Sequence, residues 1–218
     1  MNADAIVGSA AGQLRIYMAD GMGGFTPPNT VVVSGGVAEV AIGDFSGDQN
    51  EDVVVASGGV SALTMFLGDG MGNLGPPANI DVGATSASAL AIGDINGDGD
   101  LDIAFIDDTT LRVVLGNGAL AFSDGASIEV GKDQLFQALL LVDVTNDGLD
   151  DLVFGRPNDT QLAIFPSNGD GTFGERVDFA LEHGVRELTH GDANGDGLPD
   201  LLPSNPLFGG VSLLLSNP

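Results

Sequence analysis

The sequence has no cysteine and no tryptophan, and it contains only one tyrosine, two histidines and six basic residues among 218. Without cysteine the chain can form no disulfide, zinc–thiolate site or cysteine nucleophile. The histidines, His183 and His190, and the single Tyr17 supply little material for general acid–base catalysis. We therefore predict that the chain is not an enzyme and assign it no catalytic residue.

The few basic residues are outnumbered by 31 acidic ones, so the formal net charge is −25. A surface of this charge repels nucleic acid backbones and anionic lipid headgroups. No apolar run approaches the length of a membrane-spanning helix. We expect neither nucleic acid binding nor membrane insertion.

The acidic residues are concentrated in a recurring motif. Hydrophobic residues make up 43% of the chain, which argues against disorder despite the high charge. Twenty-five of the 31 acidic residues are aspartates, and fourteen of these lie in four short loops. The loops begin at Asp44, Asp94, Asp143 and Asp192, which are 50, 49 and 49 residues apart. This spacing indicates a structural repeat.

The donor pattern of the loops predicts a cation site in each. Counted from the first aspartate, side-chain oxygens recur at positions 1, 3, 5 and 9, and the varied position 7 suits a backbone carbonyl ligand. Position 6 is glycine in three copies, as expected where a chain turns sharply around an ion. An all-oxygen set suits Ca²⁺ better than Mg²⁺. We predict about four Ca²⁺ ions, held by Asp44, Ser46, Asp48, Asn50, Asp52, Asp94, Asn96, Asp98, Asp100, Asp102, Asp143, Thr145, Asp147, Leu149, Asp151, Asp192, Asn194, Asp196, Leu198 and Asp200.

Other readings of the loops are weaker. An EF-hand requires glutamate at position 12, where this chain has Val55, Phe105, Phe154 and Pro203. A single such string would be read as an ordinary polar turn, but four copies in phase favour metal binding. The Asp44 loop is the least regular copy, because serine stands at position 3 and Gln49 at position 6. We expect the ions to be structural, because they would neutralise carboxylates clustered between core strands.

The segments between the loops predict short strands. One strand enters each loop, at residues 37–42, 87–92, 137–142 and 186–190, and further strands follow the loop. A glycine-rich turn after the third strand ends in a large apolar residue, here called the anchor: Phe25, Leu74, Phe122 and Phe173. Four antiparallel strands per 49 residues predict an all-β fold, a β-propeller of about five blades. A β-sandwich is the main rival.

The single domain, residues 1–218, divides into repeats at approximately 4–51, 52–101, 102–150 and 151–199, with a partial repeat at 200–218. We count three strands, then three sets of four, then three, which gives eighteen. The chain is therefore either a compact five-bladed ring with two depleted blades or a portion of a longer propeller, completed by further blades or an oligomer. Pro203 falls at a central strand position, so we expect an irregular last blade.

The string from Ala91 to Ala104 resembles the FG-GAP/VCBS repeat, which occurs in the integrin α-subunit propeller and in many bacterial surface proteins. The segments at 66–74 and 168–173 resemble the second half of that repeat. The resemblance covers essentially the whole chain, although the Gly-Ala-Pro motif is absent and the repeat count falls below the usual seven blades. It implies a β-propeller with Ca²⁺ at positions 1, 3, 5, 7 and 9 of each loop.

The resemblance implies an integrin-like binding module for cell adhesion, located outside the cell or at its surface. The ligand would be a protein or a glycan, and the lack of tryptophan favours a protein. The N-terminus has no signal peptide pattern, so either export information is absent or the chain is a mature or excised portion. The alternatives are an accessory or catalytic domain of an extracellular enzyme and a structural spacer.

Overall fold

The computed structural model describes residues 4–58, 62–84, 86–130, 138–207 and 209–216. These residues form eighteen β-strands, all paired antiparallel, in five separate sheets. None of the described residues is helical, and so none forms a helix that could cross a bilayer. The number of strands and their grouping match the expectation from the repeats.

Each sheet is built from strands that are consecutive in the chain. Sheet 1 contains β1 (Ala5–Ser9), β2 (Gln13–Tyr17) and β3 (Asn29–Val32). Sheet 2 contains β4 (Glu39–Gly43), β5 (Asp52–Ala56), β6 (Leu63–Phe66) and β7 (Ala78–Ile80). Sheet 3 contains β8 (Leu90–Gly93), β9 (Asp102–Asp107), β10 (Thr110–Leu115) and β11 (Ser123–Glu129). Sheet 4 contains β12 (Ala138–Val142), β13 (Asp151–Gly155), β14 (Gln161–Phe165) and β15 (Val177–Ala180). Sheet 5 contains β16 (Glu187–Gly191), β17 (Asp200–Asn205) and β18 (Gly210–Val211).

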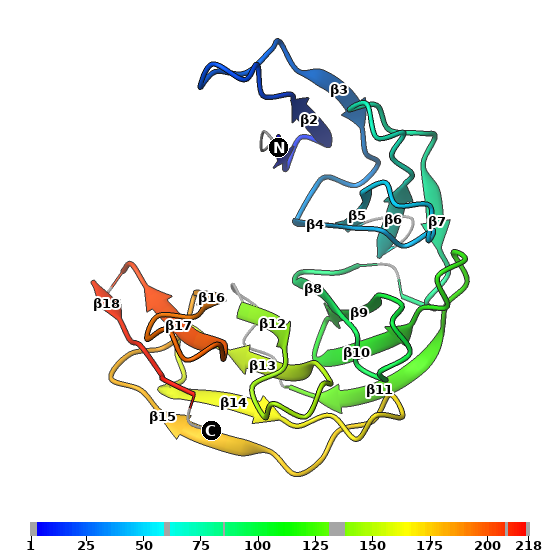
Figure 1. The fold of residues 1–218 in the computed structure, drawn as a ribbon. Coiled ribbons are helices and arrows are strands. Elements are labelled where there is room, and N and C mark those ends of the chain that lie inside the picture. Colours follow the sequence, from blue (N-terminus) through cyan, green and yellow to red (C-terminus); the bar gives the residue numbers. More distant parts are fainter. Residues whose placement is uncertain (1–3, 59–61, 85, 131–137, 208, 217–218) are drawn as a thin grey trace.

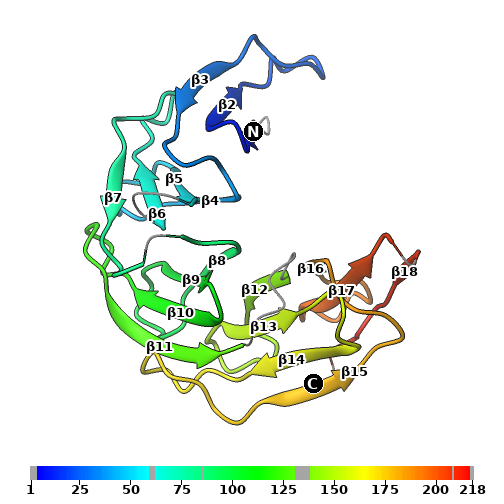
Figure 2. The ribbon, with the colours of Figure 1, turned by 180° about the vertical axis from the view of Figure 1, so that it is seen from behind.

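The five sheets are the blades of a β-propeller (Figures 1 and 2). The first strand of each complete blade lies innermost, and the fourth lies at the outer rim. The blades are offset by one strand from repeats counted loop to loop, since the 52–101 repeat holds β5, β6, β7 and also β8 of the next blade. The chain between repeats therefore ties neighbouring blades together. Of the predicted entering strands, residue 137 lies outside the described residues.

The hydrophobic core lies between consecutive blades. In β5, Val53 and Val55 pack with Leu14 of sheet 1, whereas Val54 packs on the other side with Ile103 of sheet 3. Neighbouring residues of a strand point to opposite faces, so a strand buried on both sides is apolar at every position. Four such clusters join sheets 1 and 2, 2 and 3, 3 and 4, and 4 and 5.

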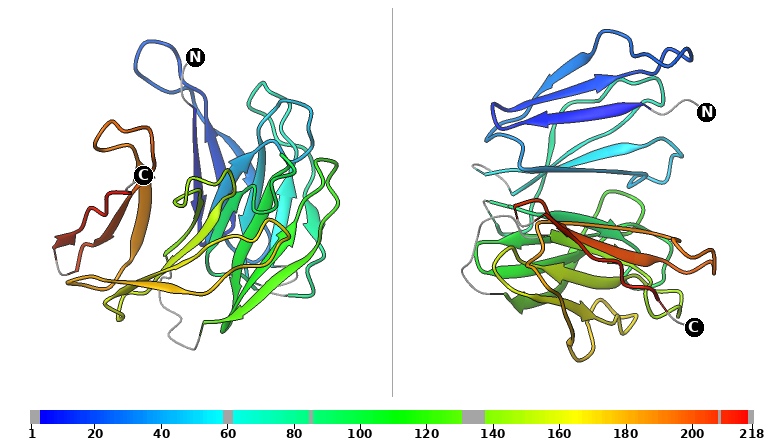
Figure 3. Two further views of the ribbon diagram at one scale, coloured as in Figure 1. Left: turned by 60° about the horizontal axis from the view of Figure 1, so that its bottom comes forward. Right: turned by 90° about the vertical axis from the view of Figure 1, so that its left-hand side faces the viewer.

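The five-bladed propeller is confirmed, but its ring has an opening. The blades curve around a common axis and leave a space between sheet 1 and sheet 5 (Figures 1 and 3). Among the described residues, no hydrophobic cluster joins these two sheets. The closed five-bladed ring is therefore not the arrangement observed.

The last blade is irregular, as expected from Pro203. Proline lacks an amide hydrogen, so the Pro203 carbonyl accepts a hydrogen bond from the Ser212 amide at 3.0 Å, but Pro203 donates none in return. The strand β18 is accordingly only two residues long, and pairing resumes as an isolated bridge between Leu201 and Leu214. The ladder of strand pairing at the outer edge of sheet 5 is therefore short and interrupted.

Candidate metal centre

Each aspartate-rich loop joins the first two strands of a blade, as predicted. The Asp44 loop connects β4 to β5, and the other three occupy the same place in sheets 3, 4 and 5. The entering strands occupy the same place in each sheet, so the loops emerge at the same end of the propeller. All twenty predicted ligand residues lie within the described parts of the chain.

The position 1 aspartate organises each loop through backbone amides. One carboxylate oxygen accepts hydrogen bonds from the position 5 amide, at 3.2 Å in the Asp44 and Asp94 loops and 3.1 Å in the Asp143 and Asp192 loops. The other oxygen accepts from the position 6 amide at 2.8 to 3.0 Å. The chain is thus wound around the first carboxylate in all four copies.

The winding requires left-handed backbone at position 6. The φ angles of Gly99, Gly148 and Gly197 are 86°, 89° and 86°, which glycine adopts without steric cost. Gln49 has the same conformation with a φ of 70°, which a residue with a side chain adopts only at an energetic cost. The predicted sharp turn is confirmed, and the irregular Asp44 loop follows it despite the substitution. Position 4 is also left-handed in every copy, which the sequence analysis did not anticipate.

The position 5 aspartate stays at the exposed tip of each loop. One oxygen of each of these carboxylates accepts from the position 7 amide, at 2.8, 2.9, 3.0 and 2.9 Å in chain order. In the two most regular loops the position 3 asparagine also donates to this carboxylate, at 2.9 Å for Asn96 and 2.8 Å for Asn194. Side chains at positions 1, 3 and 5 are therefore held in one hydrogen-bonded network.

The position 9 aspartate has a structural role that the sequence analysis missed. Asp52, Asp102, Asp151 and Asp200 are fully buried. One oxygen accepts from amides at the start of the loop, such as Ile95 to Asp102 at 2.9 Å. The other accepts from a backbone amide in the segment after the third strand, at 3.0, 2.8, 2.9 and 2.9 Å from Gly68, Gly116, Ser167 and Ser216 respectively. This carboxylate therefore fastens the loop to the third strand of its own blade.

Burial makes some of these carboxylates hard to ionise. Desolvation raises the pKa of Asp102 to about 6, against the opposing effect of the Ile95 and Gly116 amides, and the charges of Asp98 and Asp94 raise it further. Desolvation also raises the pKa of Asp151. At Asp200 burial acts in the same direction, but the amides of Ala193 and Ser216 outweigh it, and the pKa is lowered. A nearby cation would favour the charged form of each.

Two neighbouring loops are also bonded to each other. The Asp150 carboxylate accepts from the Asp94 amide at 2.8 Å, and the Asp150 amide donates to the Asp94 carbonyl at 3.0 Å. The Ser167 hydroxyl donates to the Ile95 carbonyl at 2.6 Å. These contacts join the Asp94 and Asp143 loops across the blade boundary, and no spacing in the sequence indicates them.

The loops supply the right chemistry for a hard cation. Each offers at least three carboxylates and an amide or hydroxyl oxygen within nine residues, and no soft donor. Among the described residues, the backbone amides of each loop occupy some of the carboxylate lone pairs. Carboxylate oxygens retain further lone pairs. The residues therefore fit Ca²⁺, and ligation at positions 1, 3, 5, 7 and 9 stays a prediction.

The chain belongs to the FG-GAP-like repeat family. The family pattern matches residues 44–105, 94–154 and 143–202, which together cover more than half of the chain. Each match begins at the first aspartate of a loop and runs through the following blade and loop. The predicted resemblance is therefore confirmed. A search of curated protein sequences gives no significant match.

Solved structures with similar folds are propellers of larger size. One is a lectin from Agrocybe aegerita that recognises non-reducing terminal N-acetylglucosamine, with a TM-score of 0.65 and 18% identity over 98% of this chain and 63% of that chain. Another is BBS1N in complex with ARL6DN, with a TM-score of 0.63 and 12% identity over 97% of this chain and 63% of that chain. The chain thus spans less than two thirds of these structures, which at such identities share its fold alone.

Proposed function

We propose that this chain is a calcium-stabilised propeller that serves as a binding module outside the cell or at its surface. The observation that carries the proposal is the fourfold recurrence of one oxygen-rich loop between the same two strands of successive blades. A catalytic site would be needed once, whereas a structural ion is needed in every blade that has the loop. The repetition therefore favours a role for the ions in holding the blades.

The charges explain why an ion would be needed. Each loop packs at least three carboxylates into nine residues, and the last of them is buried. Backbone amides offset part of their mutual repulsion, yet burial still raises the pKa of Asp102 and Asp151. A bound Ca²⁺ would supply the missing positive charge and fix the loop to the strands on either side.

A protein is the favoured ligand, and a glycan is the second candidate. The propeller neighbours include both a lectin and a protein complex, so the fold accommodates either class. Sugars are commonly held against aromatic side chains, but this chain has no tryptophan, and Phe45, Phe66 and Phe105 are buried in the core. A protein surface can be recognised without such aromatic platforms.

Calcium binding can be tested by calorimetry and thermal melts. We expect saturable uptake of about four Ca²⁺ per chain, and a melting temperature that rises with Ca²⁺ and falls with EDTA. Asp98→Asn should remove uptake by one loop while preserving its acceptor for the Asp100 amide. Asp124→Asn, an exposed position on β11 outside the loops, is the matched control and should leave uptake unchanged. No detectable uptake by the wild type would refute the proposal.

Ligand binding requires a separate measurement. The calcium-loaded protein would be applied to a glycan array and to immobilised extracellular matrix proteins, with Asp98→Asn run in parallel. Saturable binding to a matrix protein supports a protein ligand. Binding to a defined glycan would instead identify the chain as a glycan-binding module. Calcium uptake without binding to either surface would favour the structural spacer.

A further inference from the structure

Positions 7 and 8 of the Asp143 loop lie against the Asp94 loop. The Asp150 carboxylate accepts from the Asp94 amide at 2.8 Å, and the Asp150 amide donates to the Asp94 carbonyl at 3.0 Å. The side chain of Leu149 lies beside Gly97, where an added Cβ would meet its Cδ2 atom at 2.8 Å. Both backbone groups of the first residue in one loop are thus bonded to a single residue of the next loop.

These contacts involve residues that we predict to hold the ions. Asp150 lies between Leu149 and Asp151, the position 7 and position 9 ligands predicted for the Asp143 loop. Across the blade boundary it is bonded to Asp94, the position 1 ligand predicted for the other loop. An ion in either loop would therefore hold a segment of backbone that the other loop also uses.

A second connection runs through Ser167, in the segment after β14. Its hydroxyl donates to the Ile95 carbonyl at 2.6 Å, and its amide donates to the Asp151 carboxylate at 2.9 Å. The Ile95 amide in turn donates to Asp102 at 2.9 Å. All four residues are buried, and hydrogen bonds shielded from water are electrostatically stronger. The position 9 carboxylates of the two loops are therefore linked through three buried hydrogen bonds.

The charge of Asp150 also acts on both loops. Desolvation raises the pKa of Asp150, the amides of Asp94 and Asp143 counteract this effect, and the charges of Asp94 and Asp143 raise the pKa further. The Asp150 carboxylate therefore lies within electrostatic reach of the first aspartate of each loop. The two loops contain eight carboxylates, four in each, against the four positive charges of two Ca²⁺ ions. This negative charge offsets the repulsion between two bound ions.

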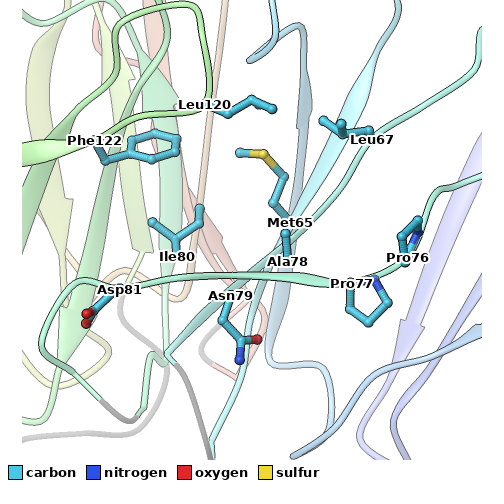
Figure 4. A pocket seen from close by; sticks show the side chains of 10 residues that line it. All are labelled: Met65, Leu67, Pro76, Pro77, Ala78, Asn79, Ile80, Asp81, Leu120 and Phe122. Atoms are coloured by element: carbon cyan, nitrogen blue, oxygen red, sulfur yellow. The ribbon is translucent and has the colours of Figure 1, made fainter.

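Apolar contacts occupy the corresponding places at the boundary between sheets 2 and 3. At its loop end, the side chain of Leu101, position 8 of its loop, lies against Gly43. At its outer rim, Phe122 lies beside Met65 and Ile80 (Figure 4). The leucine side chain has no hydrogen-bond acceptor, so it cannot bond to the first amide of the preceding loop. This boundary therefore provides an internal comparison.

We propose that the Asp94 and Asp143 loops bind Ca²⁺ cooperatively, because Asp150 and Ser167 fasten the two loops to each other. The inference rests on the proposed calcium binding. The first ion orders the shared segment, so the second ion meets a loop that has already lost part of its conformational freedom and binds more tightly. Such coupling is reciprocal, so each ion strengthens the binding of the other by the same factor. Asp150 is thus a positioning residue and not a ligand.

Calorimetry on the whole chain can measure this coupling. Replacing the position 5 aspartate by asparagine should disable a loop and keep its acceptor for the position 7 amide, in the four variants Asp48→Asn, Asp98→Asn, Asp147→Asn and Asp196→Asn. The parent protein carries the first and last of these changes, so that only the Asp94 and Asp143 loops can bind. Adding Asp147→Asn isolates the Asp94 loop, and adding Asp98→Asn isolates the Asp143 loop.

The parent protein should take up two ions more tightly than the isolated loops do. We expect the product of its two association constants to exceed the product for the isolated loops at least about fivefold, a ratio here called the coupling ratio. A coupling ratio of one would overturn the cooperative pair and leave the proposed calcium binding intact. No uptake by the wild type would remove both proposals.

Asp150→Leu locates the coupling, because it introduces the residue type that the preceding loop has at position 8. It should keep the uptake of two ions and lower the coupling ratio to about twofold or less. Glu39→Leu is the matched control, since Glu39 also bonds across a blade boundary, to the Leu90 amide at 2.9 Å, but at the end of β4 away from the loop. The control should leave the coupling ratio unchanged. An unchanged ratio in Asp150→Leu would show that Asp150 does not couple the loops.

Hydrogen exchange supplies a readout that does not depend on affinity and decides the question if Asp150→Leu does not fold. In the protein whose Asp143 loop alone can bind, added Ca²⁺ should slow exchange of the Asp94 and Ile95 amides at least about fivefold. Ser167→Ala keeps the amide bond to Asp151 but removes the hydroxyl bond to Ile95, and should reduce the slowing at Ile95. Exchange that does not respond to Ca²⁺ in this protein would overturn the proposal.

Discussion

At the residue scale, the backbone conformation of the loops matters as much as their carboxylates. Position 6 must adopt a positive φ for its amide to reach the first aspartate, and this holds whether the residue is glycine or Gln49. A Cβ added at Gly99, Gly148 or Gly197 would meet no atom within 4 Å, so space does not select glycine there. Glycine is favoured at position 6 by the backbone conformation, and not by a lack of space for a side chain.

Gln49→Gly should therefore stabilise the protein. We expect a gain of up to about 1 kcal/mol in the free energy of unfolding. The reason is that relief of the left-handed strain outweighs the free-energy cost of the greater conformational entropy that glycine gives the unfolded chain. The melting temperature should rise by roughly 2–4 °C. Gly148→Ala is the matched opposite change and should lower stability by about 1–2 kcal/mol. Both would be measured in EDTA, and a destabilised Gln49→Gly variant would contradict this account.

At the element scale, each outer turn stabilises the blade that precedes it. Phe122 is half-buried against the core between sheets 2 and 3, with Phe45 at a ring-centroid distance of 6.4 Å. Phe25 holds the same position in sheet 1, but no described blade precedes that sheet, and the ring is 54% exposed. Phenylalanine thus occupies the anchor position in both sheets, but among the described residues only Phe122 packs against a preceding blade.

The difference between Phe122 and Phe25 predicts that the same change to alanine has unequal effects on the free energy of unfolding. Phe122→Ala should lower the free energy of unfolding by about 2–3 kcal/mol, below the cost for a fully buried ring. Phe25→Ala should cost about 1 kcal/mol or less, mainly through its edge-to-face contact with Tyr17. Urea denaturation of both variants measures the difference. Equal losses would show that the anchors act within their own blade and not on the preceding one.

At the scale of the whole molecule, stability should vary along the arc. Sheets 2, 3 and 4 are covered on both faces, whereas sheets 1 and 5 share a core with only one neighbour among the described residues. Val7 is 51% exposed and Val211 is 72% exposed, although the corresponding Val55 and Leu63 of sheet 2 are fully buried. The terminal blades therefore bury less apolar surface per residue.

Native-state hydrogen exchange should reveal this gradient. We expect the amides of β9 and β13 to exchange most slowly and those of β2 and β17 to exchange faster, even though all four lie inside their sheets. Stacked repeat units owe much of their stability to contacts with their neighbours, so units with one neighbour open first. Equal protection in all five sheets would indicate that the arc unfolds as a single unit and would contradict this prediction.

The sequence alone determined the blades and the loops. The repeat of 49 residues fixed the number of strands and their grouping, because turn residues and strand-forming residues are local signals that recur in phase. The oxygen donors identified the loops as candidate cation sites, and Pro203 marked the irregular blade. These features depend on short stretches of chain, so the local sequence is enough to predict them.

Only the tertiary structure decided how distant residues combine. The position 9 aspartates bond to amides after the third strand, and Asp150 joins two loops from different blades. The opening of the ring depends on the angle and contact between whole sheets. Such features are set by packing between separate parts of the chain, and no local pattern of residues encodes them.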